Sequence, residues 1–289
     1  MRDTAARLPR LRLSHPSGSA AEVYLQGAHV TSWIPAGGSE ALFLSRAATF
    51  QPGKAIRGGV PVVFPQFAEL GPLPKHGFAR VQPWERVDHA DRPGAVRLRL
   101  RDSDETRRIW PHAFVAELVV EIGGDWLSLG LTIRNTGDAA FKFTAALHTY
   151  LRVGDVRRAT VQGLQGVRYR DRDTGEQGRE DEDHAVSIQG EVDRVYLNTP
   201  RELRVHDPRN QRTFLLRAEG FADTVVWNPW ASGAASLPDM EDDEYREMLC
   251  VEAAQVAEPV RLEAGASWTG SQRLQVIGFV EPIHRSQSS

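Results

Sequence analysis

The sequence predicts an all-β protein, built as a large antiparallel β-sandwich with few short helices. Alternation of apolar and polar residues, enriched in β-branched and aromatic side chains, recurs from end to end. Turn sequences such as Gly123-Gly124, Asn135-Thr136-Gly137 and Asp207-Pro208-Arg209-Asn210 separate these segments. Stretches with the 3.6-residue period of a helix are short and rare. This pattern favours antiparallel sheets packed face to face over parallel βαβ units.

Eleven segments carry the strand pattern: Ala21–Leu25, Ala41–Leu44, Ala95–Leu100, Phe114–Ile122, Trp126–Arg134, Phe141–Val153, Glu202–His206, Thr213–Arg217, Thr224–Val226, Leu249–Ala253 and Gln272–Phe279. One short helix is expected at Glu241–Met248, because its acidic start suits the helix dipole. Two runs of mixed charge, Arg101–Arg108 and Arg168–His184, are expected to be solvated loops or hairpin ends.

The 289 residues contain nothing that resembles a linker, so we expect one large domain over residues 1–289. Hydrophobic residues make up 41% and charged residues 25%, which is typical of a globular protein with a sizeable core. The net charge of −3 lacks the basic excess of a nucleic-acid binder. We expect a monomer without a nucleic-acid partner.

The single cysteine, Cys250, excludes an internal disulfide and a CxxC motif, which fits a reducing compartment. The N-terminal residues include arginines but no apolar core of signal-peptide length. No run of about 18 apolar residues follows, as a membrane-spanning helix would need. We therefore expect a cytoplasmic protein that does not enter a membrane.

The stretch from Ile56 to Arg80 resembles a binding site more than packing material. Its four glycines and four prolines exclude a helix. Four potential cations stand against a single acid, Glu69, so an anion is the natural ligand; the cations are Arg57, Lys75, His76 and Arg80. The alternative is a glycine-rich connection whose arginines only face solvent.

Motifs for metal and nucleotide binding are missing from the sequence. None of the nine histidines stands in an HxH or HExxH spacing, and none is a sequence neighbour of Cys250. Phosphate-binding glycine loops and a GxSxG elbow are also missing. We therefore predict no metal and no cofactor, which leaves acid–base chemistry.

His148 and Glu252 are the strongest acid–base candidates. In a strand over Phe141–Val153, His148 lies on the face opposite Phe141, Phe143, Ala145 and Leu147. Glu252 lies opposite Leu249, Val251 and Ala253, in an otherwise apolar run where an ionised group would need a partner or a function. A structural histidine and a buried partner for an arginine remain the alternatives.

Two weaker signals follow. The motif Val225–Trp230, VVWNPW, offers aromatic faces that suit stacking on a sugar but serve equally well as a corner of the core. Asp193, just before the strand-like VYL, is a further acid with little meaning alone.

Eight motifs in order, from Ile56 to Ala254, resemble the hexose-6-phosphate mutarotases, also called glucose-6-phosphate 1-epimerases, of the aldose 1-epimerase superfamily. They are IRGGVPVVFPQF, LPKHGFAR, WPHAF, NTG, ALHTYL, DRVY, VWNPW and DDEYREMLCVEAA. The resemblance implies a galactose-mutarotase-like β-sandwich that binds its sugar in a cleft on one large sheet, without a metal or cofactor.

By position, the resemblance implies that His148 and Glu252 form the catalytic pair. It implies substrate-binding roles for Arg57, Lys75, Arg80 and Asp193, with His76 lining the sugar site and Trp227 walling it. Many relatives have glutamine where this chain has Lys75, so the chain departs there towards extra positive charge.

The implied reaction interconverts the α and β anomers of a D-hexose 6-phosphate, most simply glucose 6-phosphate. Glutamate can take the proton of the anomeric hydroxyl, and histidine can donate one to the ring oxygen. Two alternatives remain open. One is an aldose 1-epimerase for free sugars, which would leave the cations partly unpaired. The other is a non-catalytic carbohydrate-binding sandwich or a glycosidase relative, although a glycosidase would need two facing carboxylates.

Overall fold

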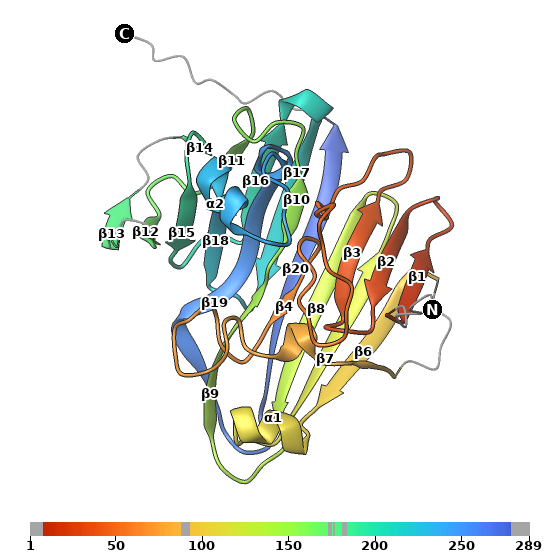
Figure 1. Cartoon of the computed structure of the whole chain (residues 1–289), viewed down its shortest axis with the longest axis vertical. Helices are drawn as coiled ribbons and strands as arrows, with labels where there is room; N and C mark the ends of the chain where they lie inside the picture. Colours follow the sequence, from red (N-terminus) through yellow and green to blue (C-terminus); the bar gives the residue numbers. More distant parts are fainter. Residues whose placement is uncertain (1–7, 88–92, 173–174, 176, 181–183, 279–289) are drawn as a thin grey trace.

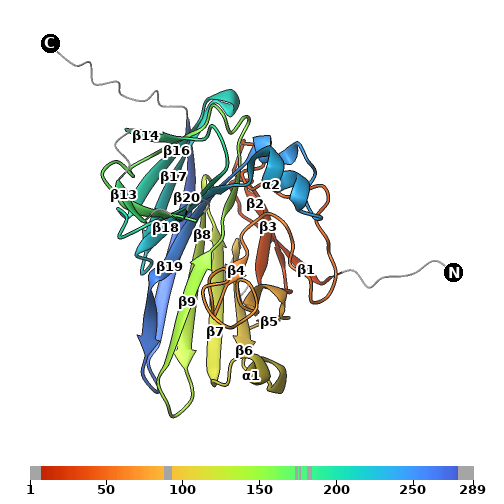
Figure 2. The same cartoon turned by 60° about the vertical axis from the view of Figure 1, so that its left-hand side comes forward.

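Antiparallel strands dominate the computed structural model, which describes residues 8–87, 93–172, 175, 177–180 and 184–278 (Figures 1 and 2). The strands are β1 (Arg10–Ser14), β2 (Ala20–Tyr24), β3 (His29–Ile34), β4 (Val62–Val63), β5 (Glu85–Arg86), β6 (Ala95–Arg101), β7 (Phe114–Ile122), β8 (Trp126–Asn135), β9 (Phe141–Leu147), β10 (Tyr150–Arg152), β11 (Thr160–Gln162), β12 (Arg168–Asp171), β13 (Gln177–Glu180), β14 (Ala185–Ser187), β15 (Val192–Tyr196), β16 (Glu202–Asp207), β17 (Arg212–Glu219), β18 (Asp223–Asn228), β19 (Met248–Leu262) and β20 (Ser267–Gly278).

Within the described residues, the strands form three sheets. The smallest has the order β1-β2-β3, and the largest has nine strands in the order β14-β11-β16-β17-β20-β8-β7-β6-β5. The third has the order β13-β12-β15-β18-β19-β9-β4, with β10 paired to β19. We call this third sheet the site sheet. Glu252 lies on its strand β19, and His148 lies in the short gap between its strands β9 and β10.

The core lies between the sheets. Buried and half-buried positions alternate strictly along β7 and nearly so along β8, as period-2 strands with one face inward require. One continuous cluster of buried residues includes Trp33 of the small sheet, Leu118 of the large sheet and Val251 of the site sheet. The predicted antiparallel sandwich is confirmed.

Most expected strands form, with two differences. Segment Ala41–Leu44 is not a strand, because it forms only isolated bridges, from Leu42 to Leu151 and from Leu44 to Gly58. The expected strand Phe141–Val153 is interrupted after Leu147, because the backbone N–H of Thr149 bonds to the carbonyl of Leu147, two residues back, instead of across to β19. Phe279, the end of the last expected strand, lies outside the described residues.

The expected helix at Glu241–Met248 is wrong in extent. Only a 3-10 turn, η3 (Glu244–Glu247), forms there, and Met248 already begins β19. The carboxylate of Glu244 turns inward, where it accepts hydrogen bonds from the Ser45 hydroxyl at 2.6 Å and the Arg46 amide at 2.7 Å. These contacts to a distant loop stabilise a tight turn in place of a helix.

Helices and 3-10 turns occur elsewhere as well: α1 (Asp104–Ile109), α2 (Trp230–Ser236), η1 (Ala79–Val81) and η2 (Pro208–Asn210). Helix α1 lies inside the charged run Arg101–Arg108, where Ser103 forms a capping box with Thr106. The second charged run, Arg168–His184, contains the hairpin β12–β13. No helix within the described ranges is long and apolar enough to cross a membrane.

The segment after β4 runs over the site sheet and is fixed by an aromatic cluster. Phe64 contacts Phe78, Trp110, Phe114 and Phe143 with ring centroids 5.3 to 6.3 Å apart. At Gly77 the backbone has φ 68°, and a side chain there would collide with the carbonyl of Phe64. The predicted anion-binding stretch is thus held rigidly against the sheet.

Candidate active site

His148 and Glu252 face each other across two neighbouring strands. Leu147 pairs with Ala253, and Tyr150 pairs with Cys250, so one register holds on both sides of the gap between β9 and β10. Continuing this register through the gap places His148 opposite Glu252. Directly opposed residues of an antiparallel pair project from the same face. The faces expected for both residues are confirmed, because Leu147, Leu249 and Val251 lie in the main core on the other side.

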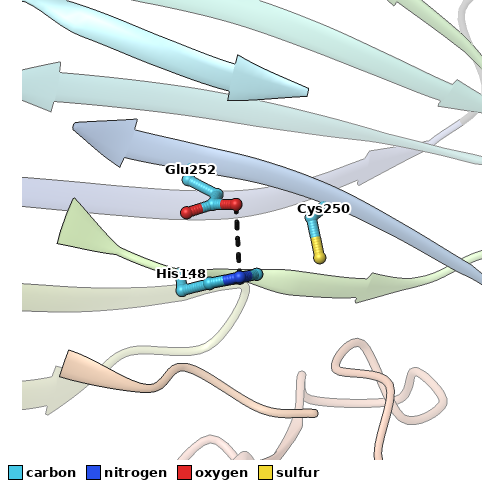
Figure 3. Close-up of side chains that lie close together, drawn as sticks. All are labelled: His148, Cys250 and Glu252. Carbon is cyan, nitrogen blue, oxygen red and sulfur yellow. Dashed lines mark ion pairs between the residues drawn. The ribbon is translucent and has the colours of Figure 1, made fainter. Parts of the chain in front are cut away.

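The two side chains are close, buried and incompletely bonded. Nδ1 of His148 lies 3.3 Å from Oε1 of Glu252 (Figure 3), and these residues are 7% and 1% exposed. Among the described residues, neither Nδ1 of His148 nor Oε2 of Glu252 has a hydrogen-bond partner. Buried polar atoms are normally satisfied, so these two atoms mark a place where a bound molecule can supply the missing bonds.

Burial shifts both pKa values towards the neutral forms. It lowers the pKa of His148 well below 6.5, and the positive charges of Arg80 and Arg57 lower it further. Burial also raises the pKa of Glu252 well above 4.5, and the nearby carboxylate of Asp193 adds to this rise. Such opposed shifts are typical of acid–base pairs.

A row of side chains crosses the site sheet beside this pair. The strand register pairs Asp193 with Trp227, Trp227 with Cys250, and Cys250 with Tyr150. The ring of Tyr150 stacks on His148 with centroids 4.7 Å apart and 8° between the planes. Trp227 meets His148 edge to face at 6.0 Å. Trp227 is therefore beside the pair, as expected for a residue that walls the site.

His76 reaches the pair from the segment that covers the sheet. Its ring lies 5.4 Å from that of His148, and its Nδ1 accepts a hydrogen bond of 3.2 Å from the Ala68 amide. This bond leaves the proton on Nε2, which can donate. Burial, followed by the charge of His148, lowers the pKa of His76 far below its usual range. The backbone of His76 has φ 63°, an uncommon conformation for a residue other than glycine.

Arg57 is held in position by two partners. Its Nε lies 3.1 Å from the Asp239 carboxylate, and its Nη1 lies 3.1 Å from the Tyr150 hydroxyl. Burial opposes the charge of Arg57, but Tyr150 and Asp239 outweigh it and raise the pKa above the ordinary value. Because Tyr150 stacks on His148, contacts run without a break from Asp239 to the candidate acid–base pair.

Arg80 and Lys75 differ in how their charge is balanced. Arg80 donates to the backbone carbonyl of Lys75 at 2.9 Å and forms no ion pair within the described part of the chain. Burial lowers its pKa, as expected for a cation that lacks a close carboxylate. Lys75 lies at the outside, with a 58% exposed side chain that is 3.8 Å from Glu69. Lys75 is thus the least enclosed of the predicted site residues.

Three neighbours of the site were not predicted as site residues. Asp239 and Arg172 lie in loops, and Tyr150 was placed on the correct strand face without a role. Arg172 forms an ion pair of 3.3 Å with Asp193 and lies over the ring of Phe67 at 5.8 Å. The charged run Arg168–His184 forms the expected hairpin, and the pairing of Arg172 with Asp193 at the end of β12 was not predicted. Position 150, two residues after His148 on the same face, was the one available signal.

The geometry agrees with three comparisons to known proteins. The family model of aldose 1-epimerase matches residues 9–275. A protein of Cenchrus ciliaris named putative glucose-6-phosphate 1-epimerase is 40% identical over 286 residues, which covers 95% of this chain and 86% of the relative. A protein of the same name from Escherichia coli strain K12 is 38% identical, over 85% of this chain and 83% of the relative.

A solved structure agrees as well. The crystal structure of a putative mutarotase from Salmonella typhimurium superposes with a TM-score of 0.86 at 33% identity, over 94% of this chain and 91% of that one. The match to the family model spans nearly the whole described fold, including both residues of the buried pair. The chain therefore belongs to the aldose 1-epimerase family.

Proposed function

We propose that this protein interconverts the α and β anomers of D-hexose 6-phosphates, with glucose 6-phosphate as the first substrate to test. The observation that carries the proposal is the buried His148–Glu252 pair, which has two unpartnered polar atoms and stands beside two arginines. The relatives from Cenchrus ciliaris and Escherichia coli have names that state the same activity.

The reaction needs one proton donor and one proton acceptor on the pair. A base takes the proton of the anomeric hydroxyl, the C1–O5 bond breaks, and an acid protonates O5, which leaves the open-chain aldehyde. Rotation about C1–C2 presents the other face of the carbonyl, and closure reverses both transfers. The pair therefore ends with the number of protons it began with. Positioned proton transfer typically contributes ~10²–10⁴-fold.

The opposed pKa shifts favour a definite starting state. In the unliganded protein, burial favours a neutral imidazole on His148 and a protonated carboxyl on Glu252. In this state His148 begins as the base and Glu252 as the acid, the reverse of the order expected from the ordinary pKa values. The acid and the base exchange roles when the ring closes. The reaction therefore needs one transferable proton on the His148–Glu252 pair, whichever residue holds it at the start.

Arg80 and Arg57 support a phosphorylated substrate. A half-buried guanidinium without a carboxylate partner is costly, and a phosphate would supply the missing charge and hydrogen bonds. Arg57 is already paired with Asp239, which orients it while part of its planar fork stays available. Lys75, at the outside, adds positive charge at the entrance.

The remaining roles complete the proposal. His76 donates from Nε2 to a sugar hydroxyl, Asp193 accepts from another while Arg172 holds it, and Trp227 packs on an apolar sugar face. We also propose that the chain forms one domain, is a monomer, and acts in the cytoplasm without nucleic acid. The single cysteine supports the cytoplasmic location, and the net charge of −3 supports the lack of a nucleic-acid partner. Size-exclusion chromatography with light scattering tests whether the protein is a monomer.

Magnetisation exchange between the two anomers of glucose 6-phosphate, followed by NMR with and without protein, tests the proposal. We expect acceleration that falls at least about 100-fold in His148→Ala and in Glu252→Gln. The matched controls are Glu258→Gln, an exposed glutamate on the same strand, and His184→Ala, an exposed histidine.

Free glucose and galactose serve as comparison substrates in the same experiment. Equal acceleration of free and phosphorylated sugars would support the aldose 1-epimerase alternative. Binding of sugar phosphate without any acceleration would support a carbohydrate-binding protein. Wild-type acceleration in either active-site variant would show that the assigned pair is wrong.

A further inference from the structure

Cys250 completes a cluster of three potential metal ligands: it lies two residues before Glu252 on β19, and His148 joins them from a distant part of the sequence. Its Sγ, a ring nitrogen of His148 and a carboxylate oxygen of Glu252 all lie within 4.8 Å of one another (Figure 3). All three residues are buried, and Cys250 is 0% exposed. No metal motif was recognised in the sequence, but Cys250 and Glu252 share one face of β19, and the register of β9 and β10 on β19 brings His148 to them.

We propose that His148, Cys250 and Glu252 form an inhibitory site for a thiophilic divalent cation, with Zn²⁺ as the reference ion. Thiolate, imidazole and carboxylate together are ligands that Zn²⁺ prefers, and three protein ligands leave a fourth position for water. Mg²⁺ and Ca²⁺ favour all-oxygen sites and are excluded by the thiol and the imidazole.

The distances suit such an ion. Tetrahedral Zn²⁺ with ordinary bond lengths holds its ligand atoms roughly 3.3–3.8 Å apart. The His148–Glu252 contact of 3.3 Å already meets this, and all the ligand atoms lie within 4.8 Å of one another, a spread that a small side-chain rotation can close. A second observation is that Oε2 of Glu252 is enclosed and accepts no hydrogen bond among the described residues, and that Nδ1 of His148 makes no hydrogen bond there despite its contact with Oε1 of Glu252.

Charge balance sets the conditions for binding. Zn²⁺ binds thiolate and carboxylate groups in their deprotonated forms, so any protons held by Cys250 and Glu252 pass to solvent when the ion binds. The arginines near the pair weaken cation binding, whereas Asp193 favours it. A reversible inhibitor fits this balance better than a permanent structural ion.

Inhibition follows because the ion would occupy the two groups that the proposed function assigns to proton transfer, so this part of the inference depends on that proposal. Substrate and metal would compete for the same atoms. Zn²⁺ should raise KM without lowering kcat, and a chelator should restore activity.

The binding test does not depend on activity. Apo-protein is titrated with Co²⁺, and the thiolate-to-cobalt charge-transfer band is recorded in the near ultraviolet. Because the chain has one cysteine, such a band can come from Cys250 alone. We expect the band in the wild type, its loss in Cys250→Ser, its weakening in Glu252→Gln, and its displacement by Zn²⁺. The exposed-histidine variant His184→Ala should behave as the wild type.

Near-ultraviolet circular dichroism checks that each variant is folded, and Cys250→Ala replaces Cys250→Ser if a buried hydroxyl disturbs the core. In the exchange assay, half-inhibition of the cysteine variant should need at least about tenfold more Zn²⁺ than that of the wild type. A missing band in the wild type, a band that persists without Cys250, or equal inhibition of both proteins would overturn the site. If the proposed function is wrong, the metal-free protein will not accelerate anomer exchange. The cobalt band still shows in that case whether the metal site exists.

Discussion

His29 should make the protein lose stability in mild acid, and replacement with glutamine should remove this loss. His29 begins β3, is 0% exposed, and its Nε2 lies 2.7 Å from the carbonyl of Gly58. That contact requires the proton on Nε2, which leaves Nδ1 enclosed and without a partner among the described residues. A second proton would place a buried charge there. Burial, with the charge of Arg80, therefore lowers the pKa of His29 to about 4.

The size of the effect follows from linkage. The unfolded chain has a histidine pKa near 6.5, so between pH 6.5 and pH 4 it binds more protons than the folded protein, and stability falls as the pH falls. From pH 7 to pH 5 the loss from His29 alone is about 2 kcal/mol. The full difference, reached below pH 4, is about 3 kcal/mol.

Urea unfolding at pH 7, 6 and 5, followed by tryptophan fluorescence, measures this loss. His29→Gln keeps a donor for the Gly58 carbonyl but cannot titrate, so its stability should fall by about 2 kcal/mol less than that of the wild type over this range. The exposed-histidine variant His184→Gln should keep the wild-type slope. Parallel losses in wild type and His29→Gln would refute the reasoning. Gly58 directly follows Arg57, the proposed phosphate-binding residue. A change in KM in His29→Gln would therefore show that the His29–Gly58 hydrogen bond also helps to position Arg57.

Three further predictions concern the proposed site. Anomer exchange should follow a bell-shaped pH profile, because the His148–Glu252 pair must hold one transferable proton. The rate falls below the lowered pKa of His148, where both groups are protonated and no proton acceptor is left. It also falls above the raised pKa of Glu252, where both groups have lost the proton and no donor is left. Phosphorus NMR of the substrate separates these limbs from ionisation of its phosphate, and a rate independent of pH would contradict the pair. Arg80→Ala should raise KM for glucose 6-phosphate more than Arg57→Ala does, since Arg57 is already paired with Asp239, and neither should raise KM for a free sugar comparably. Equal losses on both sugars would mean that the arginines support the scaffold. Tyr150→Phe removes the hydroxyl that holds Arg57 but keeps the ring on His148, so KM should rise about 3- to 10-fold with kcat nearly unchanged; a large fall in kcat alone would show that the hydroxyl acts on the chemistry instead.

Local pattern determined the strands and their faces. Side chains alternate between the two faces of a strand, and this alternation does not depend on the neighbouring strands. The apolar positions around His148 and Glu252 were therefore enough to place both residues on the face opposite the core. The same rule failed where distant contacts compete with local preference. The turn at Glu244 formed in place of a helix because Ser45 and Arg46 bind its carboxylate. The strand is interrupted after Leu147 because the amide of Thr149 bonds back to the carbonyl of Leu147 while the Gln272 side chain occupies the carbonyl of Val251 across from it.

The tertiary structure alone decided which of these residues meet. The register of β9 and β10 on β19 sets His148 opposite Glu252, and no local pattern specifies a register between strands so far apart in the chain. Asp239 and Arg172 lie in loops, where no periodicity indicates a direction, and folding alone brings them to Arg57 and Asp193. The sequence by itself determined the kind of fold and the two proton-transfer candidates. Their separation, their opposed pKa shifts and the approach of His148 to the Cys250 thiol arise from long-range packing, because distance and burial are properties of the assembled sheets.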